Sequence, residues 1–112
     1  MYLHTELQEK TATVFVRGNM EIASAAQVRE SIESLISQRV YHVTLDLTDA
    51  AHVDSSGMAE LILCYLRLRK LGGTLFIQNA PDQMRSTFFA TRLLPDDCFR
   101  TDLLLTTDSI GT

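Results

Sequence analysis

The chain has 112 residues, 46% of them hydrophobic and 21% charged, a profile that suits one domain over residues 1–112 and excludes intrinsic disorder. The net charge of −4 and the lack of a lysine- or arginine-rich run argue against nucleic-acid binding. No apolar stretch approaches the roughly 20 residues that cross a bilayer, and no basic segment followed by an apolar one opens the chain, so we expect a cytoplasmic protein without membrane contact.

Period-two alternation predicts two strands at the start of the chain. Residues 11–17 alternate between apolar and mostly polar side chains, and the pattern ends in a turn at Gly18. Residues 1–8 alternate more weakly. We expect them to form a first strand that pairs with the second.

A helix and a third strand follow. Over residues 23–38 the apolar residues fall mostly on one helical face, which predicts an amphipathic helix. Residues 41–47 return to alternation and predict a strand. Residues 48–53 carry no such pattern and are expected to form a loop.

The next helix is marked at both ends. Residues 58–71 are apolar almost all round, with three basic residues in the last turn, where they suit the negative end of the helix dipole. The run Ser55-Ser56-Gly57 precedes this helix, and Gly72-Gly73 provides its C-terminal stop.

The last third of the chain predicts a buried strand over residues 74–78 and a helix from Asp82 to about Arg92, with Pro81 suited to its first turn. The tail, residues 98–112, fits either a short strand or part of a helix. The order β, β, α, β, α, β, α, β predicts a single α/β domain, with a mixed sheet of four to five strands and helices packed on it.

The segment with the most functional information is Asp54-Ser55-Ser56-Gly57, between the third strand and the following helix. Asp54, Ser55 and Ser56 are all favourable N-cap residues, because a short side-chain oxygen can accept hydrogen bonds from the first-turn amides. Capping alone could explain the run. Alternatively, a hydroxyl at a helix N-terminus is a favourable place for a phosphate, which would meet unpaired N–H donors and the positive end of the dipole.

Other chemistries fit the sequence poorly. His52 is the histidine nearest to Ser55, but no Gly-x-Ser-x-Gly elbow is present, and no metal-binding histidine or cysteine motif occurs. Asp46, Asp49 and Asp54 could gather at one sheet edge for aspartate phosphorylation, but no lysine follows Lys70 to complete a receiver-type site. We therefore expect no catalytic residues, no metal and no cofactor. We also expect Cys64 and Cys98 to be buried, unreactive thiols.

The chain resembles the STAS-domain family, and within it the anti-sigma-factor antagonists, over essentially its whole length. The resemblance rests on a turn after the second strand, a Leu-Asp-Leu strand, a Val-Asp-Ser-Ser-Gly-Met run and a Gly-Gly pair before a strand. In this sequence these are Gly18-Asn19-Met20-Glu21, Leu45-Asp46-Leu47, Val53-Asp54-Ser55-Ser56-Gly57-Met58 and Gly72-Gly73.

The resemblance implies a switch protein that is not an enzyme. In this family the serine directly after the aspartate is phosphorylated, which corresponds to Ser55. The implied partners are an anti-sigma factor that is also a serine kinase, which the unphosphorylated form binds to release the sigma factor, and a serine phosphatase that reverses the modification. The implied docking surface consists of Gly18, Asn19, Glu21, Asp54, Ser55, Ser56, Gly57 and Met58.

Asn19 and Glu21 replace the usual glutamate and aspartate of the family's turn, and Arg92 stands where a glycine often ends the third long helix. The alternative within the family is a structural STAS subunit of a lipid ABC transporter or of a stress-signalling complex, in which Ser55 would be a contact only. We expect the free protein to be a monomer, because no apolar stripe is left unassigned to the core.

Overall fold

The computed structural model describes residues 1–21 and 24–100, which form five strands, three α-helices and one short 3-10 helix. In chain order the elements are β1 Tyr2–Gln8, β2 Thr11–Met20, α1 Ala25–Ser37, β3 His42–Val53, α2 Ser55–Lys70, β4 Thr74–Gln78, α3 Asp82–Thr91, η1 Asp96–Cys98 and β5 Phe99–Arg100.

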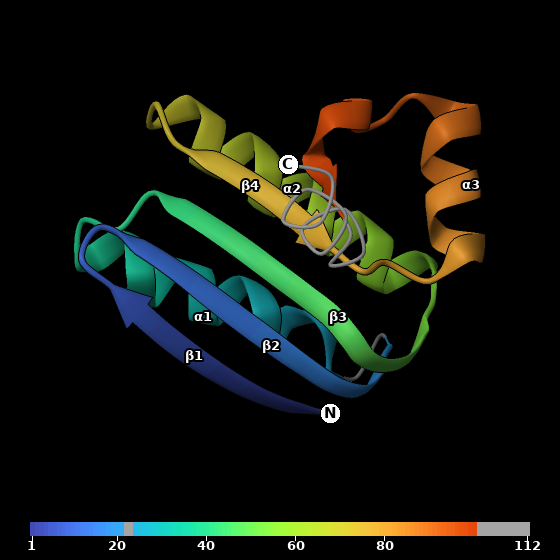
Figure 1. Cartoon of the computed structure of the whole chain (residues 1–112), viewed down its shortest axis with the longest axis horizontal. Coiled ribbons are helices and arrows are strands. Elements are labelled where there is room, and N and C mark those ends of the chain that lie inside the picture. The colour runs from blue at the N-terminus through green and yellow to red at the C-terminus, as the bar shows by residue number, and fades with distance from the viewer. Residues whose placement is uncertain (22–23, 101–112) are drawn as a thin grey trace, which may run out of the picture.

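The strands form one sheet in the order β1-β2-β3-β4-β5. The β1–β2 pair is antiparallel and the other pairs are parallel, so the sheet is mixed. Figure 1 shows α1 and α2 side by side behind the sheet and α3 at the end where β3 and β4 finish. The predicted α/β fold with a mixed sheet is confirmed, and the number of strands described is five.

The core lies between the sheet and the two helices behind it. Val14, Leu45 and Ile77 are neighbours across β2, β3 and β4, and all three are completely buried. They share this core with Ile32 of α1 and Leu61 of α2, which are also completely buried. Each such side chain contributes roughly 1.5–3 kcal/mol through removal of apolar surface from water, so the alternation seen in the sequence determines which sheet face carries the helices.

Two predictions in the first half of the chain are wrong. The turn predicted at Gly18 and the loop predicted over residues 48–53 are both strand, because β2 continues to Met20 and β3 continues to Val53. The two extensions pair with each other, with register irregularities on either side of Gly18, whose φ is +92°. Backbone pairing therefore holds these segments in the sheet where side-chain alternation has ceased.

The helices and later elements agree more closely with prediction. Helix α1 begins at Ala25, whereas the predicted start at residue 23 lies outside the described residues. Helix α2 begins at Ser55 instead of Met58. Strand β4 has the predicted bounds, and α3 ends at Thr91.

At the C-terminal end of α3, Arg92 has φ +56° and ψ +30°. This left-handed conformation favours glycine and accounts for the glycine usual at this position. The tail is described only as far as Arg100, where β5 ends, and the prediction for residues 101–112 lies outside the described residues.

Both cysteines are buried, as predicted. Burial raises the pKa of the Cys64 thiol to about 12 and that of the Cys98 thiol to about 11. Both side chains are therefore protonated at neutral pH, and the protonated thiol is a poor nucleophile.

The two glycines after α2 are required for different reasons. Gly72 has φ +79°, and its N–H donates to the Arg69 carbonyl while the Gly73 N–H donates to the Leu68 carbonyl. This is the Schellman arrangement, in which the left-handed residue favours glycine. Gly73 is required for another reason, since a Cβ there would collide with the carbonyl oxygen of Tyr41.

Alanine substitutions should separate these two roles. Gly72→Ala places a Cβ in the left-handed region with nothing within 4 Å, so it should lower the free energy of unfolding by about 1 kcal/mol. Gly73→Ala forces the β4 backbone away from Tyr41 and should cost about 3 kcal/mol or more. Urea unfolding followed by circular dichroism measures both, and equal losses would contradict this assignment.

Candidate functional site

The first turn of α2 is capped by Asp54. Its Oδ1 accepts a hydrogen bond from the Gly57 N–H at 3.0 Å, and its main-chain oxygen accepts from the Met58 N–H at 2.9 Å. Of the three N-cap candidates in the sequence, the structure therefore selects Asp54, and Ser55 and Ser56 are the first two helical residues.

The two serine hydroxyls differ in exposure. Ser55 is exposed, whereas Ser56 is half-buried. Within residues 1–21 and 24–100, neither side chain has a hydrogen-bond partner. Ser55 thus presents an accessible hydroxyl that no element of the described fold requires.

The same turn has a favourable electrostatic environment for an anion. In the described part of the chain, the backbone N–H groups of Ser55 and Ser56 have no acceptor, as expected for the first turn of a helix. The dipole of this 16-residue helix adds partial positive charge at the same point. A phosphate on an adjacent hydroxyl would meet donors that are already oriented.

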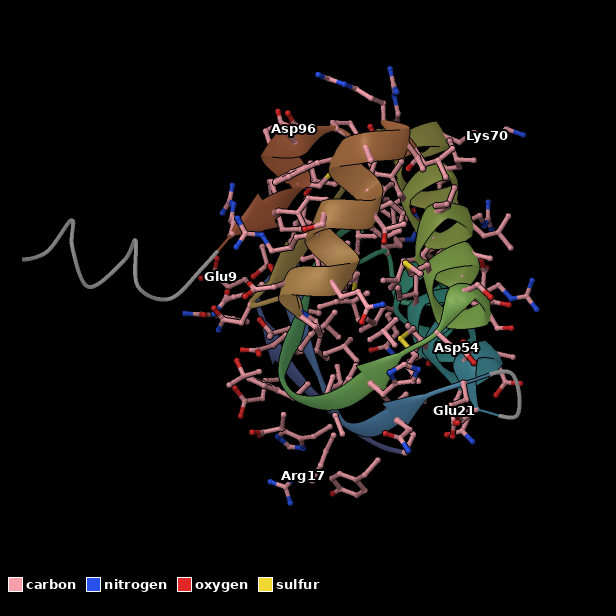
Figure 2. All side chains as sticks on the ribbon, turned by 90° about the vertical axis from the view of Figure 1, so that its right-hand side faces the viewer. Glu9, Arg17, Glu21, Asp54, Lys70 and Asp96 are labelled. Atoms are coloured by element: carbon pink, nitrogen blue, oxygen red, sulfur yellow. The ribbon has the colours of Figure 1, made fainter. Side chains whose placement is uncertain are left out.

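The end of β2 lies directly against this turn. The Asp54 N–H donates to the Met20 carbonyl at 3.2 Å, which joins the strand end to the helix cap. Figure 2 looks onto this edge and shows Glu21 and Asp54 close together, one after β2 and the other before α2. The structure therefore brings two segments that are far apart in the sequence to one surface.

Gly57 makes this close approach possible. A Cβ at this position would lie 2.8 Å from the Met20 carbonyl oxygen and 3.0 Å from both Met20 Cγ and Val53 Cγ1. Gly57 is buried, and its lack of a side chain lets the helix approach the two strands.

The other predicted contact residues are placed as follows. Asn19 and Glu21 are exposed, and Asn19 lies opposite His52 in the β2–β3 register. Gly18 lies opposite Ala50 within the sheet. Met58 is half-buried and packs against the core, so only part of its side chain is available as the apolar centre of a docking surface.

The carboxylates considered for aspartate chemistry have separate roles. Asp46 is 8% exposed, and its Oδ1 accepts hydrogen bonds from the backbone N–H and the hydroxyl of Thr48. Thr48 in turn accepts from Asn79 Nδ2 at 2.8 Å, which links β3 to the residue after β4. Asp49 is exposed, and the described residues contain no group of three metal-ligating side chains.

One ionic contact near the site was not predicted. Arg29 Nε of α1 lies 3.4 Å from Glu60 Oε2 of α2, and the Glu60 side chain is only 17% exposed. Further along the same helix pair, Arg67 binds both oxygens of Glu33, which lowers the pKa of that carboxyl. These pairs depend on how α1 and α2 pack, and the sequence carries no signal for them.

Comparisons with known proteins agree with this architecture. The family model for the STAS domain matches residues 2–103. The solved structure of the anti-sigma factor antagonist SpoIIAA in its unphosphorylated form is 17% identical, with 99% of this chain and 98% of that chain covered and a TM-score of 0.76. The phosphorylated form of SpoIIAA, a Bacillus cell fate determinant, is 19% identical, with 89% and 90% covered and a TM-score of 0.75.

An anti-sigma factor antagonist from Mycobacterium paratuberculosis is 21% identical over 95% of this chain and 92% of its own, with a TM-score of 0.72. At these identities the likeness establishes the fold. No curated protein matches the sequence. Among the helices in the described part of the chain, none combines the length and apolar character that a membrane span needs.

Gly57→Ala tests the junction of strand and helix. Alanine in place of glycine normally favours a helix by about 0.5–1 kcal/mol, but the contacts with Met20 and Val53 should outweigh this gain and give a net loss of about 1–2 kcal/mol. Ser56→Ala, one residue earlier, is the matched control and should change the free energy of unfolding by less than about 0.5 kcal/mol. Chemical unfolding of both variants measures the difference, and a stabilised Gly57→Ala protein would refute the close approach.

Proposed function

The chain belongs to the STAS domain family, and we propose that within this family it acts as an anti-sigma factor antagonist controlled by phosphorylation of Ser55. In this proposal the unphosphorylated form binds an anti-sigma serine kinase and so releases the sigma factor. The observation that carries the proposal is the exposed Ser55 hydroxyl at the first turn of α2, beside the end of β2.

Phosphorylation would use this chain as a substrate. The kinase supplies ATP, Mg²⁺ and a base that takes the proton from Ser55 Oγ. A bond then forms between Oγ and the γ-phosphorus while the bond from that phosphorus to the leaving ADP oxygen breaks. This protein contributes the acceptor hydroxyl and the surface on which the kinase docks.

Exposure favours Ser55 over Ser56 as the acceptor. A kinase must align the hydroxyl with the γ-phosphorus, and the half-buried Ser56 is less accessible for that alignment. Ser55 also directly follows the capping aspartate, as the phosphorylated serine does in the family that the sequence resembles. These two arguments are independent and select the same residue.

The phosphorylated protein should keep its fold. The Ser55 hydroxyl makes no hydrogen bond in the described residues, so its modification removes no stabilising contact. The phosphate adds about 1.5 to 2 negative charges at pH 7, next to helix N–H groups that favour an anion. The switch would therefore act on docking, through a charged and strongly hydrated group at the centre of the interface.

The proposed docking surface comprises two neighbouring segments. One is the start of α2 with its cap, Asp54 to Met58, and the other is the end of β2 through Glu21. SpoIIAA, described as an anti-sigma factor antagonist, has been solved in unphosphorylated and phosphorylated forms, and both resemble this chain in fold. That a protein of this fold carries phosphate in one form supports the proposal.

The proposal extends to the cellular setting. A serine phosphatase would return the protein to the binding form. Because the partners control transcription, the protein would act in the bacterial cytoplasm, as substrate and binding partner and not as an enzyme. In the alternative, a structural STAS subunit of a transporter or stress-signalling complex, Ser55 would contact a neighbour without being modified.

Three variants test the switch. With a cognate anti-sigma kinase and ATP, the wild-type protein and Ser55→Ala should both bind, but only the wild type should gain one phosphate by intact-mass spectrometry. Ser55→Asp should bind at least about tenfold more weakly, a loss of about 1.4 kcal/mol or more by titration calorimetry.

Ser56→Ala is the matched control, since it removes a hydroxyl from the same turn. It should bind and be phosphorylated like the wild type. A phosphate that peptide mapping places on Ser56 would overturn the assignment. Absence of phosphorylation by every kinase that binds the protein would favour the structural-subunit alternative.

A further inference from the structure

The outer edge of β1 is unprotected. Strand β1 lies at the end of the sheet and pairs with β2 alone among the described strands, as Figure 1 shows. Of its seven residues, all except Leu3 are exposed, including Leu7 at 52% and Tyr2 at 62%. Proteins usually protect such edges with charged side chains, above all lysine, with proline or with a bulge; β1 has no lysine, proline or bulge, and Glu6 is its one carboxylate.

We propose that two copies of the protein associate by antiparallel pairing of their β1 strands about a twofold axis at Thr5. In this register Leu3 lies opposite Leu7 of the second copy, and His4 lies opposite Glu6 of the second copy. Each pair occurs twice because of the symmetry. The two sheets then form one continuous sheet.

Complementarity between an imidazole and a carboxylate selects this register. His4 and Glu6 lie on the same side of the strand, their side chains are 55% and 64% exposed, and His4 Nε2 is 3.3 Å from Glu6 Oε2. Pairing about Thr5 places each histidine opposite a carboxylate of the other strand. An imidazole N–H can donate a hydrogen bond to a carboxylate across two strands, whereas two carboxylates directly opposite each other destabilise a sheet.

The neighbouring registers are less favourable. A twofold axis at Glu6 places two carboxylates opposite each other, and an axis at His4 places two imidazoles opposite each other. If one β1 strand slides along the other by a single residue, the helix-bearing face of one sheet comes to lie beside the open face of the other. Only the register about Thr5 pairs each imidazole with a carboxylate and also pairs Leu3 with Leu7.

The surface beside the edge has room for the second strand. On the helix side, a hollow of about 300 Å³ is lined by Thr5 and Leu7 of β1 and by Leu35, Ser31 and Ser34 of α1. The opposite Leu3 would cover the exposed Leu7 next to this hollow. Burial of apolar surface would then add to the backbone hydrogen bonds of the new strand pair.

This inference is independent of the proposed function. Ser55 lies at the start of α2, after β3, and β2 separates β3 from the β1 edge. Both copies in the dimer would therefore keep Ser55 accessible. The sequence predicted a monomer because no apolar stripe was left unassigned to the core. Apolar stripes give no information about an open strand edge.

Sedimentation equilibrium over a concentration series tests the pairing. The wild-type protein should dimerise reversibly, and Thr5→Lys, which places two lysines opposite each other at the axis, should raise the dissociation constant roughly tenfold or more. Ala90→Lys adds the same charge at an exposed position of α3 and is the matched control. A wild-type protein that stays monomeric up to roughly 1 mM, or a dimer that Thr5→Lys leaves intact, would overturn the proposal.

Charge exchange identifies the register. His4→Glu makes the edge wholly acidic and Glu6→Lys makes it basic, so each variant alone should dimerise more weakly than the wild type. An equimolar mixture should form a heterodimer, because the glutamate introduced in one variant would lie opposite the lysine introduced in the other, and the remaining Glu6 opposite the remaining His4. Circular dichroism checks that both variants are folded, and a mixture that associates no better than either variant would contradict the His4–Glu6 pairing.

Discussion

The contact between Gly57 and the end of β2 is the constraint on which the candidate site depends. It is close enough that a Cβ would meet the Met20 carbonyl oxygen at 2.8 Å. Two hydrogen bonds reinforce it, one from the Asp54 N–H to Met20 and the other from the Gly57 N–H to the Asp54 carboxylate. Because the backbone of α2 is held at its first turn, the direction of Ser55 is fixed by the scaffold and not by its own side-chain contacts.

Most of the fold could be predicted from the sequence because most of the core lies where the apolar pattern is strong. Ala12, Val14 and Val16 of β2 alternate with more polar residues in the sequence and are buried in the structure. Strand β4 was predicted from the short apolar run Leu75-Phe76-Ile77, and its predicted bounds are those of the structure. The failures have one physical origin. The extension of β2 past Gly18 and that of β3 past Leu47 are held by backbone hydrogen bonds between two largely exposed segments, and backbone pairing leaves no hydrophobic pattern.

The candidate site was predictable in part. Residue type alone marked Asp54, Ser55 and Ser56 as capping residues, but the choice of Asp54 depends on which of the three side chains reaches a first-turn N–H, here that of Gly57. Proximity of Glu21 to this cap also needed the structure, because it follows from the strand pairing that prediction missed. The Arg29–Glu60 contact also could not be predicted from the sequence, because it depends on the packing of α1 against α2.

The charges around Ser55 restrict how the proposed switch can work. Glu21 and Asp54 make the unmodified surface acidic, so a complementary partner presents positive charge to it. A phosphate added to such a surface would strengthen the long-range attraction, within the Debye length of about 10 Å. Loss of docking must then come from direct contact. The phosphate is larger than the hydroxyl, and it would have to lose bound water where the partner covers Ser55. This mechanism requires Ser55 itself to lie within the interface, because at its rim the added charge would leave binding unchanged or tighter.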